Sequence, residues 1–375
     1  MRYEDKNGAG TSEVAVDSLE DERRDGRKGC LVRSHNEWDP LEEIIVGDVE
    51  HARIPSKDYG FKVTASSAND LLSIDICGKY PRWIIEETRE DIDEFVEALE
   101  SLGVVVRRPK DMEISDFRTP DWESDSFFSY CPRDTLLAIG ETIIETPNVF
   151  RSRYFENHVY KELLTEYMKS GARWLAAPKP RLLESGYNAE RESGLSLRNH
   201  EPVFDAANVI RAGKDIFYQL SDSGNELGMW WLQNTLGEEY RVHAIPAEIY
   251  SSVHIDSTLC FLKPGLLLAN PERVKIELLP EVLREWEILW APEMVEYQYS
   301  DIKPISSKWL GMNLLMLSPS LAVVDKHQKA LIRLLEDRGI DVLPLCLRHG
   351  HVLGGGFHCI TLDVRRRGGL ESYFD

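Results

Sequence analysis

The sequence lacks the long apolar run that a membrane-spanning helix needs. No stretch of its 375 residues approaches about 18 consecutive apolar side chains, and no basic-then-apolar leader opens the chain. We therefore expect a cytoplasmic protein. Positive charge is also scarce, because 44 Lys and Arg residues stand against 64 Asp and Glu, a formal net charge of −20. A field of this sign repels phosphate backbones and anionic membrane surfaces, so neither nucleic acid nor a membrane is an expected partner.

Cysteine is sparse, and the usual metal and nucleotide motifs are missing. The six cysteines form no CxxC pair, which predicts reduced thiols rather than a disulfide framework. No HExxH, GxGxxG or P-loop motif is present, which agrees with an enzyme that uses no cofactor. His349, His351 and His358 could in principle gather a metal ion. A better interpretation is that two of these histidines lie in surface turns and the third has a structural role. We therefore predict no metal.

The chain divides into a short arm and one large domain. Residues 1–28 mix acidic and basic side chains with Gly, Ser and Asn and show no apolar period, which predicts a flexible arm. The many acidic residues of this arm do not fit a mitochondrial presequence. No linker interrupts residues 29–375, and a hydrophobic content of 42% supports one substantial core.

One pattern recurs five times from about residue 84 onward: an amphipathic helix, often a glycine, and a short apolar strand that ends near proline. Gly103, Gly171, Gly237 and Gly339 stand at the helix ends, where glycine is a favoured cap, whereas the fourth unit, residues 278–292, has none there. Further strand candidates punctuated by turns are residues 42–48, 134–145, 208–220, 263–271 and 320–325. Two strands, a helix and another strand in each unit predict a pseudo-symmetric α/β array around an axis, with a doubly wound sheet as the alternative.

A cysteine near the C-terminal end stands in an unusual setting. Cys359 follows Gly354–Gly356 and the pair Phe357-His358. Glycine allows close backbone approach and positive φ, and such a run can present a nucleophile to a ligand in a confined pocket. A buried structural cysteine is the alternative interpretation.

Two carboxylates and a histidine are further candidates. Asp134 and Asp205 lie at or beside apolar strands, where a carboxylate is costly to bury unless it is paired. A planar guanidinium would satisfy both, although a salt bridge to a resident arginine, such as Arg133 or Arg211, is the plainer explanation. His254 could carry a proton, with Asp256 on the same face if this stretch is extended, but a satisfied core histidine is commoner.

Ten segments, in order over about residues 30–375, resemble the arginine-dependent amidinotransferases. They are SHNEWDPLEEIIVG (34–47), RTPDWES (118–124), CPRD (131–134), ETPNVFRSRYFE (145–156), APKPRL (177–182), EPVFDAAN (201–208), HIDST (254–258), NPERV (270–274), SSKWLGMNLLML (306–317) and LGGGFHCITLDVRRRG (353–368). The family fold that this resemblance implies is a five-bladed α/β propeller of ββαβ modules, which agrees with the repeats. The resemblance also implies a homodimer.

The resemblance further implies a reaction and a role for each matching residue. L-arginine would donate its amidino group to an amine, and L-ornithine would leave. Cys359 would be the nucleophile, Asp134 and Asp205 would hold the guanidinium, and His254 would protonate the leaving amine and later act as base. The residues that would bind the α-amino and α-carboxylate ends of the donor are Asp256, Arg273, Ser306 and Ser307.

Within this family the sequence most resembles the inosamine-phosphate branch, with a saxitoxin-type enzyme as another close candidate. The glycine branch carries Asn and Met at the positions of Ser251 and Val253, and an acidic residue at that of Asn208. Smaller side chains near His254 predict an acceptor larger than glycine, bound near Ser251 and Val253. Two alternatives stay open at this point: a deiminase-type guanidine hydrolase and a non-catalytic arginine-binding protein.

Overall fold

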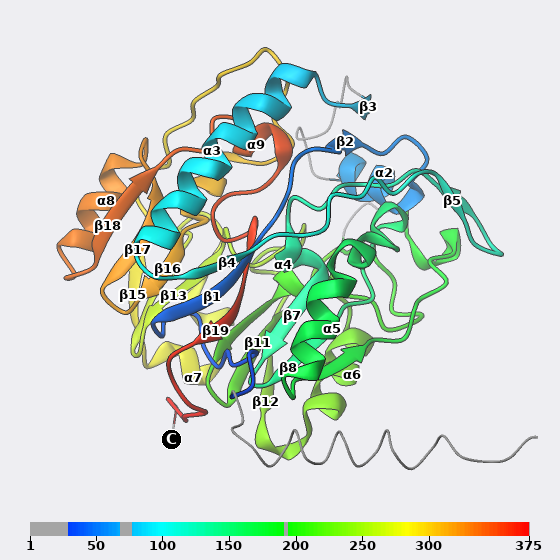
Figure 1. The fold of residues 1–375 in the computed structure, drawn as a ribbon. Coiled ribbons are helices and arrows are strands. Elements are labelled where there is room, and N and C mark those ends of the chain that lie inside the picture. The colour runs from blue at the N-terminus through cyan, green and yellow to red at the C-terminus, as the bar shows by residue number, and fades with distance from the viewer. Residues whose placement is uncertain (1–28, 68–76, 191–193, 375) are drawn as a thin grey trace, which may run out of the picture.

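The computed structural model describes residues 29–67, 77–190 and 194–374. The arm predicted for residues 1–28 lies outside the described residues. The fold is α/β, with five three-stranded sheets that are built alike (Figure 1). In each sheet the central strand pairs antiparallel with one neighbour and parallel with the other. The parallel strand follows the central one after a crossover that contains a helix, as parallel pairing requires.

The five modules follow one another along the chain, apart from one strand. The first contains β19 (Thr361–Arg366), β1 (Leu41–Val46), α3 (Arg82–Ser101) and β4 (Val105–Arg107). The second contains β7 (Leu136–Ile139), β8 (Thr142–Glu145), α5 (Lys161–Lys169) and β9 (Arg173–Ala176). The third contains β10 (Val209–Ala212), β11 (Asp215–Gln219), α6 (Glu226–Leu236) and β12 (Arg241–Ile245). The fourth contains β13 (Leu259–Lys263), β14 (Leu266–Ala269), α7 (Glu281–Arg284) and β15 (Glu287–Trp290). The fifth contains β16 (Leu315–Ser318), β17 (Leu321–Asp325), α8 (Lys329–Glu336) and β18 (Asp341–Leu345).

The repeats predicted from the sequence are confirmed, together with their turn glycines. Gly103, Gly171, Gly237 and Gly339 have φ angles of 83°, 108°, 73° and 70°, in the left-handed region where glycine carries no steric penalty. The fourth module has only the four-residue helix α7 and needs no such glycine. The described residues form no doubly wound sheet.

The sequence did not reveal how the first sheet is completed. Its antiparallel strand is β19, which comes from the other end of the described chain and lies beside β1 (Figure 1). The register pairs Val46 with Thr361. Cys359 lies two residues before β19, so this long-range pairing fixes the position of the predicted nucleophile.

Apolar clusters join each sheet to the next. Ile45 of β1 and Leu136 of β7 share one cluster, and Leu137 of β7 and Ile216 of β11 share a second. A third and largest cluster joins the third, fourth and fifth modules. A fourth joins the fifth module to the first, through Val323 and Ile44. The sheets are thus linked in sequence order, and the last is linked to the first.

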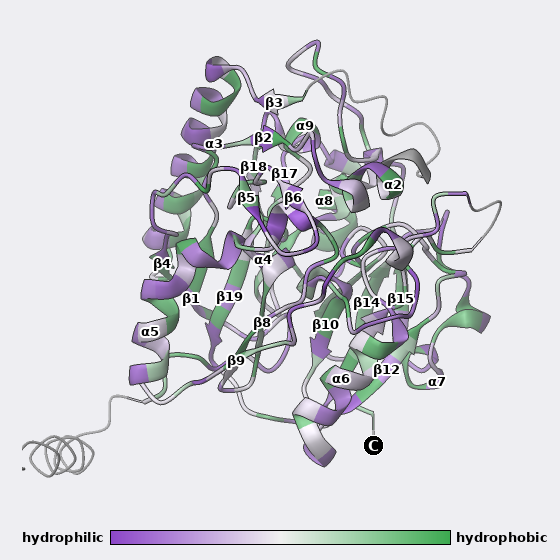
Figure 2. Ribbon diagram, turned by 90° about the vertical axis from the view of Figure 1, so that its right-hand side faces the viewer, coloured by the Kyte–Doolittle hydropathy of each residue, from purple (hydrophilic) through white to green (hydrophobic). Residues whose placement is uncertain are grey.

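The longer helices cover the outside of these sheets. Helix α3 buries one stripe that includes Ile85, Ile92 and Leu99, spaced as one face of an α-helix requires. Figure 2 shows its apolar residues on the side toward the sheets and its polar residues on the outer side. Shorter elements complete the chain. Within the first module, between β1 and α3, lie β2 (Arg53–Ile54), α2 (Tyr59–Ser67) and β3 (Gly78–Lys79). Between modules lie β5 (Phe117–Arg118), β6 (Glu123–Ser124) and α4 (Pro132–Thr135), and α9 (Gly350–Leu353) precedes β19. Among the described residues, no helix combines the length and apolar character needed to cross a membrane.

Candidate active site

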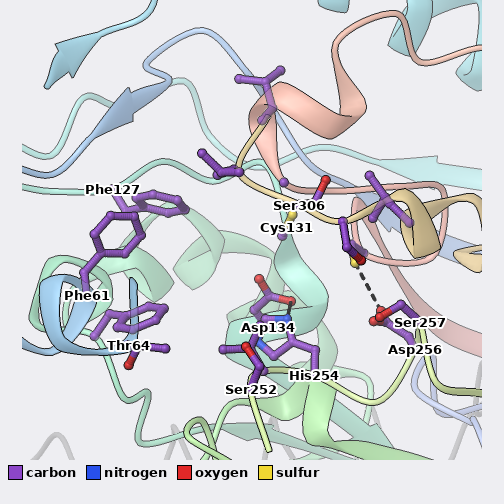
Figure 3. Close-up of a pocket in the computed structure, with 18 of the residues that line it drawn as sticks. Phe61, Thr64, Phe127, Cys131, Asp134, Ser252, His254, Asp256, Ser257 and Ser306 are labelled. Atoms are coloured by element: carbon purple, nitrogen blue, oxygen red, sulfur yellow. Dashed lines mark hydrogen bonds and ion pairs between the residues drawn. The ribbon is translucent and has the colours of Figure 1, made fainter. Parts of the chain in front are cut away.

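Seven of the ten predicted site residues line a single cavity of about 160 Å³ (Figure 3). They are Asp134, Val253, His254, Asp256, Ser306, Ser307 and Cys359. Asp205 lies behind His254, and Arg273 lies behind Ser307. The tenth residue, Ser251, is exposed and is not among the residues that line this cavity.

The three glycines before Cys359 are required by close packing inside the protein. Gly354 ends the short helix α9 with a φ of 79°. A Cβ atom on Gly355 would lie 2.7 Å from the sulfur of Cys131, and one on Gly356 would lie 2.7 Å from Asn313. The run therefore lets the chain turn into β19 with Cys359 only 4% exposed at the floor of the cavity.

The sulfur of Cys359 lies between an amide donor and a carboxylate. Asn313 donates from Nδ2 to Sγ over 3.0 Å, and its Oδ1 accepts the backbone N–H groups of His358 and Cys359 at 3.0 Å each. These two backbone bonds fix which end of the amide faces the sulfur. On the other side Sγ lies 3.1 Å from Oδ2 of Asp256 (Figure 3). Burial, and then the negative charge of Asp256, raise the pKa of the Cys359 thiol well above its usual value.

Asp256 is held in place by His358. The Nδ1 atom of His358 lies 3.1 Å from Oδ2 of Asp256, and its Nε2 lies 3.4 Å from Glu37. Burial alone would raise the pKa of Asp256, but the hydrogen bond from His358 and the charges of His358 and His254 hold it well below the usual range. Asp256 therefore stays ionised next to the buried sulfur.

His254 lies between two carboxylates and not on a strand. Its φ angle is 46°, a left-handed conformation that is uncommon for a residue other than glycine. Its Nε2 lies 3.1 Å from Asp205, and its Nδ1 lies 3.6 Å from Asp134. The extended conformation that would place His254 and Asp256 on one face is therefore wrong, and the two side chains contact different groups.

The surrounding acids keep His254 protonated. Burial would lower the pKa of this histidine, but the charge of Asp134 and the hydrogen bond to Asp205 outweigh burial and raise it to about 9. Asp205 is itself fully buried and fully bonded. Its Oδ1 accepts from the Asn148 side chain and the Val149 backbone, and its Oδ2 faces His254. Asp205 thus orients the histidine and does not itself line the cavity.

Asp134 is paired, but with neither of the arginines that the sequence suggested. It lies in α4, directly before β7, and its Oδ2 accepts from Nη1 of Arg153 at 2.5 Å. Arg153 also bonds Glu156 through Nε and Nη2, at 2.7 and 2.8 Å. Arg133 and Arg211 bond Asp363 instead.

One oxygen of this carboxylate is available to a ligand. Oδ1 of Asp134 is buried and accepts no hydrogen bond. A buried, unsatisfied carboxylate oxygen is costly, and a ligand N–H group would remove that cost. Asp134 therefore offers a cation-binding oxygen to the cavity beside His254.

A second cationic group stands behind the serines at one side of the cavity. The Arg273 guanidinium stacks on Tyr250 at 3.7 Å and donates to the hydroxyls of Ser257 and Ser307 at 2.8 and 3.2 Å. The adjacent Ser306 donates to the backbone of His351. This arrangement brings together three of the residues that were expected at the donor end, whereas Asp256 lies at the sulfur.

The three histidines considered as a metal site do not gather. His349 contacts Glu87, His351 contacts Ser306, and His358 contacts Asp256. Within residues 29–67, 77–190 and 194–374, no group of three or more His, Cys, Asp or Glu side chains is arranged to hold a metal ion. All six cysteines are free thiols in the described chain.

Sequence reasoning missed three residues of the site: Arg153, Asn313 and His358. Each lies inside a segment that carries the family resemblance, so the segments contained the signal. Their contacts with Asp134, Cys359 and Asp256 join residues far apart in the sequence, which spacing alone does not reveal.

Comparison with known proteins agrees with this geometry. The chain is 51% identical over 345 residues to inosamine-phosphate amidinotransferase 1 of Streptomyces glaucescens, an alignment that covers 92% of this chain and 99% of the relative. It is 40% identical over 353 residues to L-arginine:L-lysine amidinotransferase of Pseudomonas savastanoi pv. phaseolicola, covering 91% and 96%. No family model matches the sequence.

Two solved structures have the same fold. The inosamine-phosphate amidinotransferase of Streptomyces griseus superposes with a TM-score of 0.88 at 51% identity and covers 92% of this chain and 100% of its own. An amidinotransferase of the saxitoxin pathway from Microseira wollei gives a TM-score of 0.85 at 41% identity, with the same coverage. This chain is a transferase and belongs to the amidinotransferase family.

Proposed function

We propose that this enzyme moves the amidino group of L-arginine to an amine larger than glycine and releases L-ornithine. The reaction proceeds in two halves through an amidino group carried on Cys359. The observation that carries the proposal is the placement of Cys359, Asp134, His254 and Asp256 around one cavity. A thiol, two carboxylates and a protonated histidine are the groups that amidino transfer needs.

The donor guanidinium binds between the carboxylates. Oδ1 of Asp134, which is buried without a hydrogen bond, accepts one guanidinium N–H group, and Asp256 accepts another. The planar cation then lies with its carbon near the Cys359 sulfur. Arg273, which is chemically suited to a carboxylate clamp, binds the α-carboxylate of arginine with Ser306 and Ser307. Asp205 acts through His254 and does not touch the substrate.

In the first half-reaction the sulfur attacks the guanidinium carbon. The positive charge of the substrate lowers the thiol pKa, and the proton leaves through Asp256, the carboxylate that the sulfur already faces. His254 is protonated at neutral pH and gives a proton to the departing ornithine nitrogen, because an amine does not leave as an anion. The carbon–nitrogen bond breaks, and the amidino group remains on Cys359.

In the second half-reaction the acceptor amine attacks this carbon. His254, now neutral, takes one proton from the attacking nitrogen, and the sulfur leaves as a thiolate that regains its proton by way of Asp256. Exchange of an amidino group between two amines is nearly isoenergetic, so the proposal requires no cofactor and no metal. Ping-pong kinetics follow.

Two alternative functions are less well supported. A deiminase-type hydrolase would use a similar set of Cys, His and acidic groups with water as acceptor, but the relatives at 40% and 51% identity are named amidinotransferases. A non-catalytic arginine-binding protein would have no need of a buried thiol between Asn313 and Asp256. The acceptor belongs to secondary metabolism, a proposal supported by the named saxitoxin-pathway neighbour.

We further propose that the five modules form a closed five-bladed propeller. The apolar clusters that link successive sheets, and the fifth with the first, support this arrangement. A homodimeric state is proposed from the resemblance alone, and a cytoplasmic location from the sequence pattern, which has no long apolar run. Analytical ultracentrifugation would test the first, and fractionation of expressing cells would test the second.

Mass spectrometry of the purified protein with L-arginine and hydroxylamine tests the reaction. Ornithine together with hydroxyguanidine would support transfer, whereas citrulline without a transferred product would establish hydrolysis. Cys359→Ala should release no ornithine. A trapped mass increase of one amidino group on the peptide that contains Cys359 would demonstrate the intermediate, and turnover by the alanine variant would refute it.

A further inference from the structure

One side of the active-site cavity is aromatic, and the proposed chemistry of arginine does not use it. Phe61 from α2, together with Phe127 and Phe150, lines this side. The ring centroid of Phe61 lies 6.2 Å from that of Phe127 and 5.4 Å from that of Phe150. Figure 3 shows Phe61 and Phe127 on the side of the cavity away from Asp256. These three residues, which we call the aromatic wall, offer a surface that fits a hydrocarbon body.

The cavity lining carries no cation with free pairing capacity. Among the described residues that line it, the only basic side chains are Arg153 and His254. Arg153 is already bonded to Asp134 and Glu156, and His254 is bonded to Asp205. The two carboxylates that line the cavity add negative charge. The Arg153 guanidinium lies over the Phe127 ring at 5.3 Å, but its charge is already paired with Asp134 and Glu156. A phosphate dianion at the aromatic wall would therefore lose its hydration without gaining an unpaired counter-charge, which is costly.

One further cation, Arg273, lies away from the aromatic wall. It contacts Ser257, which Figure 3 places on the side of the cavity opposite Phe61 and Phe127. Three of its hydrogen bonds already go to Ser257 and Thr258 through Nη1. A single guanidinium in this position suits a carboxylate of charge −1, which is the group that the donor presents. It suits a phosphate dianion less well, because Asp256 is close by.

We propose that the acceptor is a primary amine with an apolar body, either hydrocarbon or aromatic, that packs on the aromatic wall and bears no phosphate. The inference rests on the proposed function, since it names the acceptor of that same site. The neutral amine forms a bond to the amidino carbon, the carbon–sulfur bond of Cys359 breaks, and His254 takes the proton. The ammonium form of such an amine is also attracted by the carboxylates and the aromatic faces.

Three amines built on the same six-carbon ring, with hydroxylamine as a small reference, test the proposal. With L-arginine as donor, hydroxylamine, cyclohexylamine, an aminocyclitol and the phosphate ester of that aminocyclitol are compared by ornithine release and by the mass of the guanidinylated product. We expect kcat/KM for cyclohexylamine to exceed that for the phosphate ester at least tenfold. A higher kcat/KM for the aminocyclitol or its phosphate ester would overturn the proposal while transfer itself stands. Absence of ornithine with every amine, hydroxylamine included, would overturn the proposed function and this inference with it.

Variants of the aromatic wall distinguish a role in binding the acceptor from a general role in packing. Phe127→Ala and Phe150→Ala should each raise the KM for cyclohexylamine about tenfold, which is the effect of losing one buried aromatic contact. Phe127→Leu should bring the KM most of the way back to the native value. Trp230→Ala, which removes an exposed aromatic ring on α6, is the matched control and should leave this KM unchanged. Equal KM values for the native enzyme and both alanine variants would overturn the proposal. A rise in KM for the apolar amine without a rise for the phosphate ester would support it.

Discussion

Asn313 donates a hydrogen bond from its side-chain nitrogen to the sulfur of Cys359 over 3.0 Å. The same side chain accepts two backbone N–H groups through its oxygen, so one residue both anchors the turn before β19 and presents a donor to the proposed nucleophile. A donor of this kind stabilises a thiolate more than a thiol. It opposes the effects of burial and of Asp256, which both raise the thiol pKa.

Asn313→Asp should slow ornithine release while keeping the turn intact. Aspartate retains the oxygen that accepts the two backbone bonds but loses the N–H donor to the sulfur. We expect kcat to fall about tenfold or more, because a hydrogen bond to a charged group contributes about 1.5 to 3 kcal/mol. Steady-state assays and a melting curve would check this. Asn199→Asp, at an exposed site, serves as control, and an unchanged kcat for Asn313→Asp would contradict the expectation.

Cys359 should react faster with an alkylating agent when an arginine analogue is bound. The free enzyme holds a thiol whose pKa is raised, and a bound guanidinium lowers that pKa. Iodoacetamide labelling, followed by peptide mass spectrometry, measures the rate at each cysteine. The exposed Cys77 in the same sample is the internal reference. Equal labelling rates for Cys359 with and without the analogue would argue against activation by substrate.

Alkaline pH should destabilise the enzyme through His254. Its folded pKa of about 9 lies above the ordinary value of 6.5, so the folded state binds this proton more tightly than the unfolded chain does. The stabilisation is fully present below about pH 6.5 and is lost as the pH rises through 9, in total about 3 kcal/mol. Urea unfolding of the native enzyme and of His254→Gln at several pH values would measure it. An equal decrease in the free energy of unfolding with rising pH in the two proteins would show that His254 is not the cause.

Arg153→Lys should weaken the binding of arginine. A lysine cannot bond Asp134 and Glu156 together with the fixed geometry of a guanidinium, so Asp134 loses its orientation. We expect the KM for arginine to rise about tenfold and the free energy of unfolding to fall by about 3 kcal/mol, as for other broken buried pairs. Arg151→Lys is the matched control, because Arg151 is also buried but bonds the backbone of Leu182. An equal rise in KM for both variants would point to general loosening.

Val253→Met should discriminate against large acceptors. Val253 lines the cavity, and the longer side chain would occupy space there. The KM for cyclohexylamine should rise several-fold, whereas turnover of the much smaller hydroxylamine should change less. Ser251→Asn, at an exposed position outside the cavity, is expected to change neither value. If Ser251→Asn and Val253→Met behaved alike, the geometry of this segment would be wrong.

Local patterns in the sequence revealed the modules, because four of the five module helices are followed by a glycine whose positive φ is determined locally. The left-handed glycines Gly103 and Gly339 are examples. The partner of β1 was not predictable in this way, because β19 is far away in sequence and no short-range rule couples them. Similarly, the spacing of Asp134 pointed to its neighbour Arg133, whereas the fold supplies Arg153.

The conformation around His254 shows a different limit of prediction from sequence. Alternating residues such as His254 and Asp256 share a face only if the segment is extended, and the φ of 46° at His254 breaks that condition. The identities of the site residues followed from family motifs, but the division of roles did not. Asp205 supports the histidine and Asp256 faces the sulfur, and only the tertiary contacts show this.

The pairing of β1 with β19 has a consequence for the growing polypeptide. Until β19 leaves the ribosome, β1 keeps an unpaired edge, and such an edge must be shielded from other chains. The segment that covers this edge also delivers Cys359. Closure of the first sheet and arrival of the proposed nucleophile are therefore one event, and a nascent chain places no Cys359 sulfur in the cavity until β19 has been made and paired.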